Sequence, residues 1–184
     1  MESCVSVATQ PIPIFPPTAA IPLRAMPLAP LSLALTAACR RISRAHPGLI
    51  RRLGEHDHCA FALDPTDLPV VLLLEPNGGV PRLRVMRGEV ASDARISGPL
   101  AALIGLVHGA FDGDALFFSR DLVISGDTGA ALALRNAVDD AELDLAEEFA
   151  AMTGPLAVPM RRLFAMVERR TGVALTRPEE VGTW

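Results

Sequence analysis

The chain has 184 residues, a formal net charge of −4 at pH 7, 50% hydrophobic residues, only 4% aromatic residues and no tyrosine. The acidic balance argues against a general binder of phosphate backbones, and the few aromatic residues argue against a stacking surface for single-stranded nucleic acid. All 17 basic residues are arginine, which excludes a Schiff-base lysine and a P-loop lysine. A chain of this length is expected to form one domain with extensions.

Residues 1–30 form a proline-rich arm. Proline fixes φ and lacks an N–H group, so the arm is predicted to be neither a helix nor a central strand. Because it also carries Ile12, Ile14 and Phe15, we expect it to pack on its own domain, with a second copy or a membrane surface as alternatives. It has no basic region before its apolar part, and nothing in the chain reaches the ~18 apolar residues of a membrane span, so a cytoplasmic protein is predicted.

The central domain is expected over residues 31–152. It begins with a helix from Leu31 to Ser43 or Arg44 and a short helix over Leu49–Leu53. Runs of β-branched, aromatic and aliphatic residues then predict strands at Cys59–Leu63, Val70–Glu75, Arg82–Arg87, Asp93–Ser97, Ala115–Ser119 and Leu122–Ser125. The sequence Pro76-Asn77-Gly78-Gly79 is typical of a hairpin turn between the second and third of these.

Helices are predicted in the second half of the chain. Pro99 should open a helix over Leu100–Ala110, which is apolar nearly all round and is therefore buried, or faces core on one side and a ligand on the other. A polar corner at Gly126–Gly129 should cap a helix over Ala130–Val138. Two more helices are expected at Glu142–Met152 and, within a C-terminal segment 153–184, at Val158–Arg170.

Catalytic and metal chemistry have little support in the sequence. The only compact group of metal-capable residues is His56-Asp57-His58-Cys59, and no second cluster completes a zinc site, so we predict no metal. Cys4, Cys39 and Cys59 are widely spaced and are expected to be free thiols. A small hydrolase or isomerase using His108 or paired aspartates is the enzymatic alternative. No nucleophile stands beside a base, so we expect no enzyme and no cofactor.

One stretch resembles a known family. It is the run Phe117-Phe118-x-Arg120-x-Leu122-Val123-Ile124-x-Gly126-Asp127-Thr128, followed by Leu132, Leu134, Asn136 and Asp139. This stretch is similar to the last strand and following helix of the sterol carrier protein 2 (SCP2) lipid-binding domain, and most of all to the bacterial branch that assists oxygen-independent ubiquinone biosynthesis. Ser125 departs from that branch, which tends to carry glutamate there. A weaker pattern extends the similarity over residues 49–145.

The resemblance implies an α+β fold, in which a mainly antiparallel sheet of about five strands and its helices form an apolar lipid tunnel. It also implies a non-catalytic accessory protein that binds ubiquinone precursors and presents them to iron–sulfur hydroxylases resembling U32 peptidases. A general carrier of fatty acyl or phospholipid chains is the alternative. We name as candidate lining residues Leu100, Leu103, Ile104, Val107, Phe111, Phe117, Phe118, Leu122, Ile124, Leu132, Leu134, Val138, Leu163 and Val167, for which plain hydrophobic core is the other interpretation.

The last helix carries four arginines beside an apolar stripe. A basic amphipathic helix can lie on anionic lipid, which would place the protein at the periphery of the inner membrane. An ordinary solvated helix face explains the same pattern. The residues concerned are Arg161, Arg162, Arg169 and Arg170.

Overall fold

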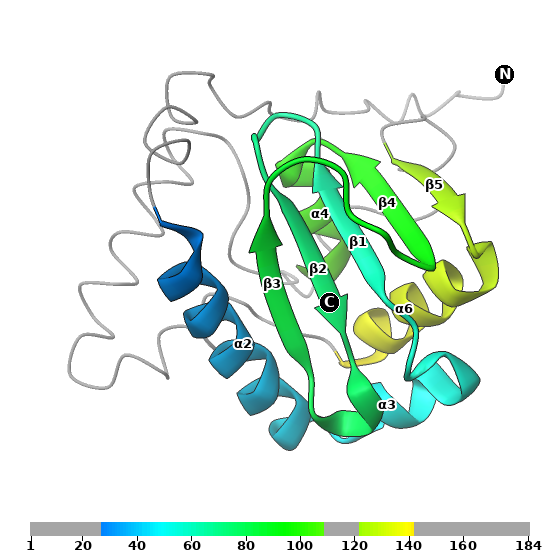
Figure 1. Cartoon of the computed structure of the whole chain (residues 1–184). Coiled ribbons are helices and arrows are strands. Elements are labelled where there is room, and N and C mark those ends of the chain that lie inside the picture. The colour runs from blue at the N-terminus through cyan, green and yellow to red at the C-terminus, as the bar shows by residue number, and fades with distance from the viewer. Residues whose placement is uncertain (1–26, 109–121, 142–184) are drawn as a thin grey trace, which may run out of the picture.

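The computed structural model describes residues 27–108 and 122–141, and these form an α+β domain (Figure 1). The described strands make one sheet in the order β3-β2-β1-β4-β5, with β1 and β4 parallel and the other neighbours antiparallel. The predicted fold class is therefore confirmed. The strands are β1 (Phe61–Pro65), β2 (Val71–Glu75), β3 (Arg82–Met86), β4 (Ala94–Gly98) and β5 (Val123–Gly126), and the α-helices are α2 (Leu28–Ala45), α3 (Gly48–Leu53), α4 (Leu100–His108) and α6 (Thr128–Ala141).

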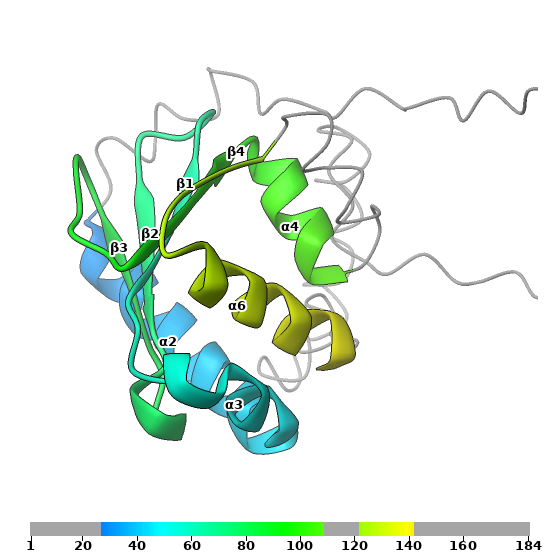
Figure 2. The same cartoon turned by 90° about the vertical axis from the view of Figure 1, so that its right-hand side faces the viewer.

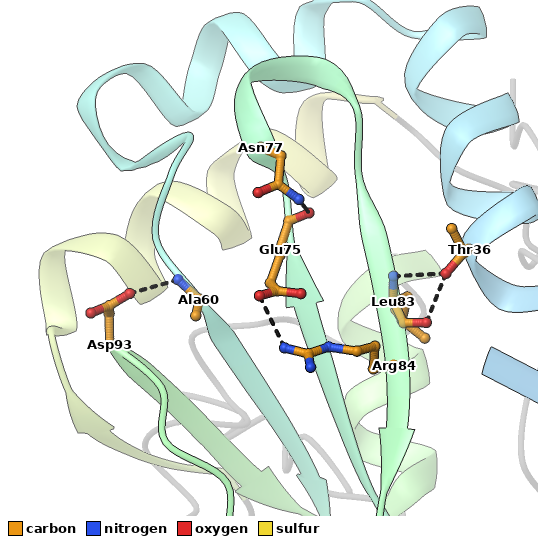
Figure 3. Close-up of polar contacts among 7 residues, drawn as sticks. All are labelled: Thr36, Ala60, Glu75, Asn77, Leu83, Arg84 and Asp93. Carbon is orange, nitrogen blue, oxygen red and sulfur yellow. Dashed lines mark hydrogen bonds and ion pairs between the residues drawn. The ribbon is translucent and has the colours of Figure 1, made fainter. Parts of the chain in front are cut away.

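The helices α3, α4 and α6 lie in a layer on one side of the sheet (Figure 2). Successive side chains of a strand point to opposite faces, so each strand has an inner face toward these helices and an outer face. Inner-face residues pair across strands as Leu72 with Val85 and Leu74 with Leu83. The outer face carries the buried residues Ala62, Val71 and Leu73. It also carries two ion pairs, one from Arg84 to Glu75 at 3.1 Å (Figure 3) and one from Arg95 to Asp64 at 2.7 Å.

The helix α2 runs along the free edge of β3 and is bound to it by polar side chains. Thr36 Oγ1 donates to the Leu83 carbonyl at 2.8 Å and accepts the Leu83 N–H at 3.0 Å (Figure 3). One turn earlier, Ser32 Oγ accepts the Val85 N–H at 2.8 Å, and one turn later Arg40 Nε donates to the Pro81 carbonyl at 3.2 Å. An edge strand exposes unpaired backbone groups, and this stripe of one helix satisfies them.

A polar corner at Gly126-Asp127 joins β5 to α6. The Asp127 N–H donates to the Asp93 carbonyl at 2.8 Å, and Asp127 Oδ1 caps the helix by accepting the Ala130 N–H at 3.0 Å. Gly126 has a φ of +79°, and a Cβ there would collide with the Asp93 carbonyl oxygen. The corner therefore requires glycine, which explains the Gly-Asp pair in the sequence.

Several predicted boundaries were wrong by a few residues. The helix α2 begins at Leu28, inside the arm that prolines were expected to keep non-helical, because Pro30 lies in its first turn, where a missing N–H costs nothing. The strand β1 begins at Phe61, because the Cys59 N–H still bonds to the His56 carbonyl and the Ala60 N–H to Asp93 Oδ2. The other predicted elements, 115–119, 142–152 and 158–170, lie outside the described residues, as does nearly all of the arm.

The core sits between the inner face of the sheet and the helices α4 and α6. Phe61 and Ile96 are 0% and 1% exposed. The helices supply small residues to this cluster, which lets their backbones approach the sheet closely: Ala102, Ala130, Ala131 and Ala137. The predicted helix after Pro99 is confirmed from Leu100 to His108, and it buries Ala101, Ala102 and Leu103. Its first free N–H, at Leu100, is accepted by Asp67 Oδ1 at 3.0 Å.

Candidate functional site

A cavity of about 270 Å³ lies between the inner face of the sheet and the helices. Its floor is made of side chains from four strands: Leu63, Leu72, Leu74, Leu83 and Ile96. Its walls are made of side chains from all four α-helices, with Pro76 at one end: Leu35, Ala38, Cys39, Ile42, Ser43, Leu49, Ile50, Leu53, Leu100, Leu103, Ile104, Leu134, Arg135 and Val138. The surface that these side chains present to the cavity is almost wholly apolar.

The position of α2 explains why the described helices leave this space open. The helix is attached to the backbone of the β3 edge through Ser32, Thr36 and Arg40. It therefore stands beside the sheet and does not lie across its inner face. An apolar void that stays empty lowers stability, because the side chains around it lose packing contacts. A hydrocarbon ligand that fills the cavity would regain much of that free energy.

Five of the candidate lining residues meet at this cavity: Leu100, Leu103, Ile104, Leu134 and Val138. Leu122 is 3% exposed within the core cluster, and Ile124 packs against the same cluster. Leu132 is 51% exposed on α6, because it lies about half a helical turn from Leu134. Val107 belongs to α4. The remaining candidates lie outside the described residues: Phe111, Phe117, Phe118, Leu163 and Val167, together with the four arginines of the last helix.

Sequence reasoning missed the contribution of α2, α3 and the strands β1 to β4. The signal in α2 was present, because Leu35, Ala38, Cys39 and Ile42 recur at the spacing of one helix face. In the strands, the signal was the alternation of side chains between the two faces, which places Leu72 and Leu74 on the same side. Neither pattern indicates a cavity, since both are equally typical of filled core.

The cavity wall contains three polar side chains, Cys39, Ser43 and Arg135. Burial raises the pKa of the Cys39 thiol from 9.0 to about 11, so the thiol is neutral at physiological pH. Arg135 carries the only formal charge among the described lining residues. Its side chain is 16% exposed, and its Nε lies 3.4 Å from Asp139 Oδ2.

The histidines of the sequence cluster lie in the turns before β1. His56 ends a short 3-10 helix (Gly54–His56), and its Nδ1 is 3.8 Å from Cys59 Sγ. Desolvation raises the pKa of the Cys59 thiol, and the carboxylates of Asp93 and Asp127 raise it further. That environment disfavours the thiolate a nucleophile requires. Within the described ranges no three His, Cys, Asp or Glu side chains converge as ligands for a metal ion.

The described part of the chain has no helix long and apolar enough to cross a membrane. Leu33 on α2 and Leu132 on α6 are exposed large apolar residues. Leu33 has other exposed apolar residues beside it on the same face of α2, namely Ala29, Pro30, Ala34 and Ala37.

Solved structures with a similar fold include sterol carrier proteins. The SCP2 domain of UbiJ, a ubiquinone synthesis protein, has a TM-score of 0.52 at 18% identity, covering 64% of this chain and 96% of that one. Protein TT1886 from Thermus thermophilus has a TM-score of 0.44 at 21% identity, covering 60% and 85%. Sterol carrier protein 2 from Yarrowia lipolytica, in its apo form, has a TM-score of 0.42 at 14% identity, covering 59% and 89%.

No curated protein is significantly similar in sequence. The likeness to the UbiJ domain, at its low identity, establishes a common fold. A model of the SCP-2 sterol transfer family, however, matches residues 35–139, which is more than half of the chain. The match includes the whole described sheet and the four described α-helices, apart from the first turns of α2 and the last two residues of α6. The chain therefore belongs to the SCP-2 sterol transfer family.

Proposed function

We propose that this protein is a non-catalytic lipid-binding accessory protein, which holds an isoprenoid quinone precursor for oxygen-independent ubiquinone biosynthesis. The observation that carries the proposal is the apolar cavity of about 270 Å³ between sheet and helices. This volume is near the lower end of ligand pockets, which are ~300–1,000 Å³. Family membership supports a lipid as the occupant.

The ubiquinone assignment has two supports. One is the Phe117–Asp139 stretch, whose pattern resembles the branch of the family that serves the oxygen-independent pathway. The other is the shared fold with a ubiquinone synthesis protein. We propose that the precursor is presented to iron–sulfur hydroxylases resembling U32 peptidases, with peripheral contact at the inner membrane.

The absence of catalysis is part of the proposal. Hydrolysis by a thiol needs a thiolate, and the surroundings of Cys59 disfavour one. The cavity walls present hydrocarbon and a neutral Cys39 thiol. The purified protein is therefore expected to leave quinone precursors unchanged.

Mass spectrometry of lipid extracted from the purified protein tests the occupant. An isoprenoid phenol or quinone supports the proposal, and fatty acids or phospholipids alone support the general carrier. Ile104→Trp, which fills the cavity from α4, should reduce the lipid recovered per protein at least several-fold. Leu132→Trp, on the exposed side of α6, is the matched control and should leave recovery unchanged.

A deletion strain tests the pathway. Ubiquinone should fall in cells grown without oxygen and stay near normal in aerobic cells, because only the first condition requires the oxygen-independent hydroxylases. If the deletion strain has equal ubiquinone levels under both conditions, the general carrier function is favoured instead.

A further inference from the structure

The solvent-facing side of α2 combines apolar and basic residues. Leu33 is 75% exposed, and its exposed neighbours on the first turns are small apolar residues. Further along the helix, Arg44 is exposed at a spacing that places it on the same face as Leu33. We call this the exposed face of α2, and it consists of Ala29, Pro30, Leu33, Ala34, Ala37, Arg41 and Arg44.

Positive charge is concentrated around this face. Residues 27–54, which include α2 and α3, carry five arginines and no acidic residue, whereas the whole chain has a net charge of −4. Two of the five have partners, because Arg40 donates to the Pro81 carbonyl and Arg52 pairs with Asp140. Of the carboxylates that the structure describes, none pairs with Arg44 or with Arg51, which is exposed on α3. Their guanidinium groups can therefore attract negative charge from outside the domain.

The helix α2 presents this face from a fixed position. Ser32 and Thr36 hold it to the backbone of β3, beside the sheet (Figure 1). A surface that is already ordered loses little conformational entropy when a partner binds. The opposite side of the same helix faces the cavity through Leu35, Cys39 and Ile42. A partner on the exposed face would thus be separated from the lipid site by one helix, a thickness of about 10–12 Å.

The composition of the face favours a protein partner over a bilayer. Helices that lie on lipid bury a large apolar area, commonly supplied by tryptophan, phenylalanine and leucine. Residues 27–54 contain no aromatic residue, and on α2, which the structure describes in full, Leu33 is the only exposed large apolar side chain. Arginine, by contrast, binds carboxylates through paired, charge-assisted hydrogen bonds and is enriched at protein interfaces.

We propose that the exposed face of α2, together with Arg51, is the docking surface for a protein that presents carboxylates beside a small apolar patch, and that this protein receives the lipid held on the other side of the helix. The inference rests on the proposed function, because it assumes that the cavity holds a lipid that is passed to another protein. Arg44 and Arg51 pair with the carboxylates of the partner, and its apolar patch covers Leu33.

The test measures binding of the full chain to a purified iron–sulfur hydroxylase of the oxygen-independent pathway by biolayer interferometry. Wild type should bind at low salt, and binding should weaken as salt is added, because exposed charges are screened. Arg44→Gln combined with Arg51→Gln should weaken binding about tenfold and reduce its salt dependence. Leu33→Asp should weaken binding by a similar factor. Each variant should still take up diphenylhexatriene, an uncharged fluorescent probe of the cavity, which shows that it folds.

Two further variants separate a docking role from a general effect of charge. Val123→Glu combined with Ser125→Glu changes the net charge by the same amount as the glutamine variant. Both positions are exposed on β5, at the opposite edge of the sheet from β3 (Figure 1), so binding should be unchanged. Arg44→Lys combined with Arg51→Lys keeps the charge and should retain part of the binding, because lysine lacks the paired donors of arginine.

The outcomes are distinguishable from those for the proposed function. If wild type takes up the probe but does not bind the hydroxylase, or if the glutamine variant binds it as tightly as wild type, the docking surface is overturned and lipid binding stands. Vesicles of phosphatidylethanolamine and phosphatidylglycerol provide a second measurement. If wild type sediments with them through Arg44 and Arg51 and the hydroxylase does not bind, the face contacts membrane and the protein partner is overturned. If wild type takes up no probe, the cavity is not a lipid site and both proposals fail.

Discussion

The two ends of the domain hold helix against sheet by different means. At the corner of β4, β5 and α6, the helix approaches through alanines and through Gly126, and the space is filled. At the β3 edge, α2 is attached by hydroxyl and guanidinium groups to the strand backbone, and its side chains form one wall of the cavity. The cavity therefore arises because one helix packs onto the face of the sheet and the other is attached to its edge.

Gly126→Ala should break the packed corner. Adding a Cβ at a φ of +79° costs ~1–3 kcal/mol in backbone strain, and its collision with the Asp93 carbonyl adds ~1–3 kcal/mol of overpacking. We expect a loss of about 4 kcal/mol in the free energy of unfolding, measured by denaturant titration. Gly48→Ala is the control, because a Cβ there would meet nothing within 4 Å and Gly48 does not have a positive φ. Equal losses in the two variants would contradict this account of the corner.

The pH dependence of stability should show whether the cavity wall around Cys39 excludes water. The Cys39 pKa is about 11 in the folded protein, compared with an ordinary value of 9.0. Between these values the unfolded chain releases the proton and the folded chain retains it, so stability falls as pH rises. The free energy of unfolding should drop by up to ~3 kcal/mol from pH 9 to pH 11, at ~1.4 kcal/mol per pKa unit.

Cys39→Ala should reduce the fall in the free energy of unfolding between pH 9 and pH 11. Any fall that remains in this variant comes from other titrating groups. An unchanged slope in Cys39→Ala would show that water reaches the thiol and that this wall is wetter than the structure indicates.

Thr36→Val should loosen the attachment of α2. The substitution keeps the shape of the side chain but removes one hydrogen bond to the Leu83 carbonyl and one from its N–H. We expect a loss of about 2 kcal/mol. If α2 is the moving wall of the cavity, lipid release should also become faster, as measured by transfer of a fluorescent lipid to vesicles. Thr66→Val, at an exposed turn, should change neither quantity.

Asp127→Ala is the smallest of the expected effects. It removes the cap of α6, a single bond from the Ala130 N–H, and should cost about 1 kcal/mol. Asp127→Asn retains an acceptor oxygen and should restore most of that loss. Stability of the alanine variant equal to wild type would mean that water replaces the cap.

The sequence by itself determined where most of the described helices and strands lie. Strand alternation, the Asn-Gly-Gly turn and the Gly-Asp corner are local patterns, and each corresponds to an element or turn of the structure within a few residues. The apolar helix after Pro99 was predicted to be buried for the same reason. These features depend on backbone geometry and on the spacing of apolar residues, both of which are encoded within a few positions.

Only the tertiary structure decided where the cavity lies and what lines it. Leu132 and Leu134 belong to the same pattern, yet one is half exposed and the other faces the cavity. No sequence pattern distinguishes Ser32, Thr36 and Arg40 from other residues of a helix. Their role follows from the position of α2 beside the edge strand β3. Whether apolar side chains fill a space or surround one depends on the distances between elements, and long-range packing sets those distances, which no local pattern specifies.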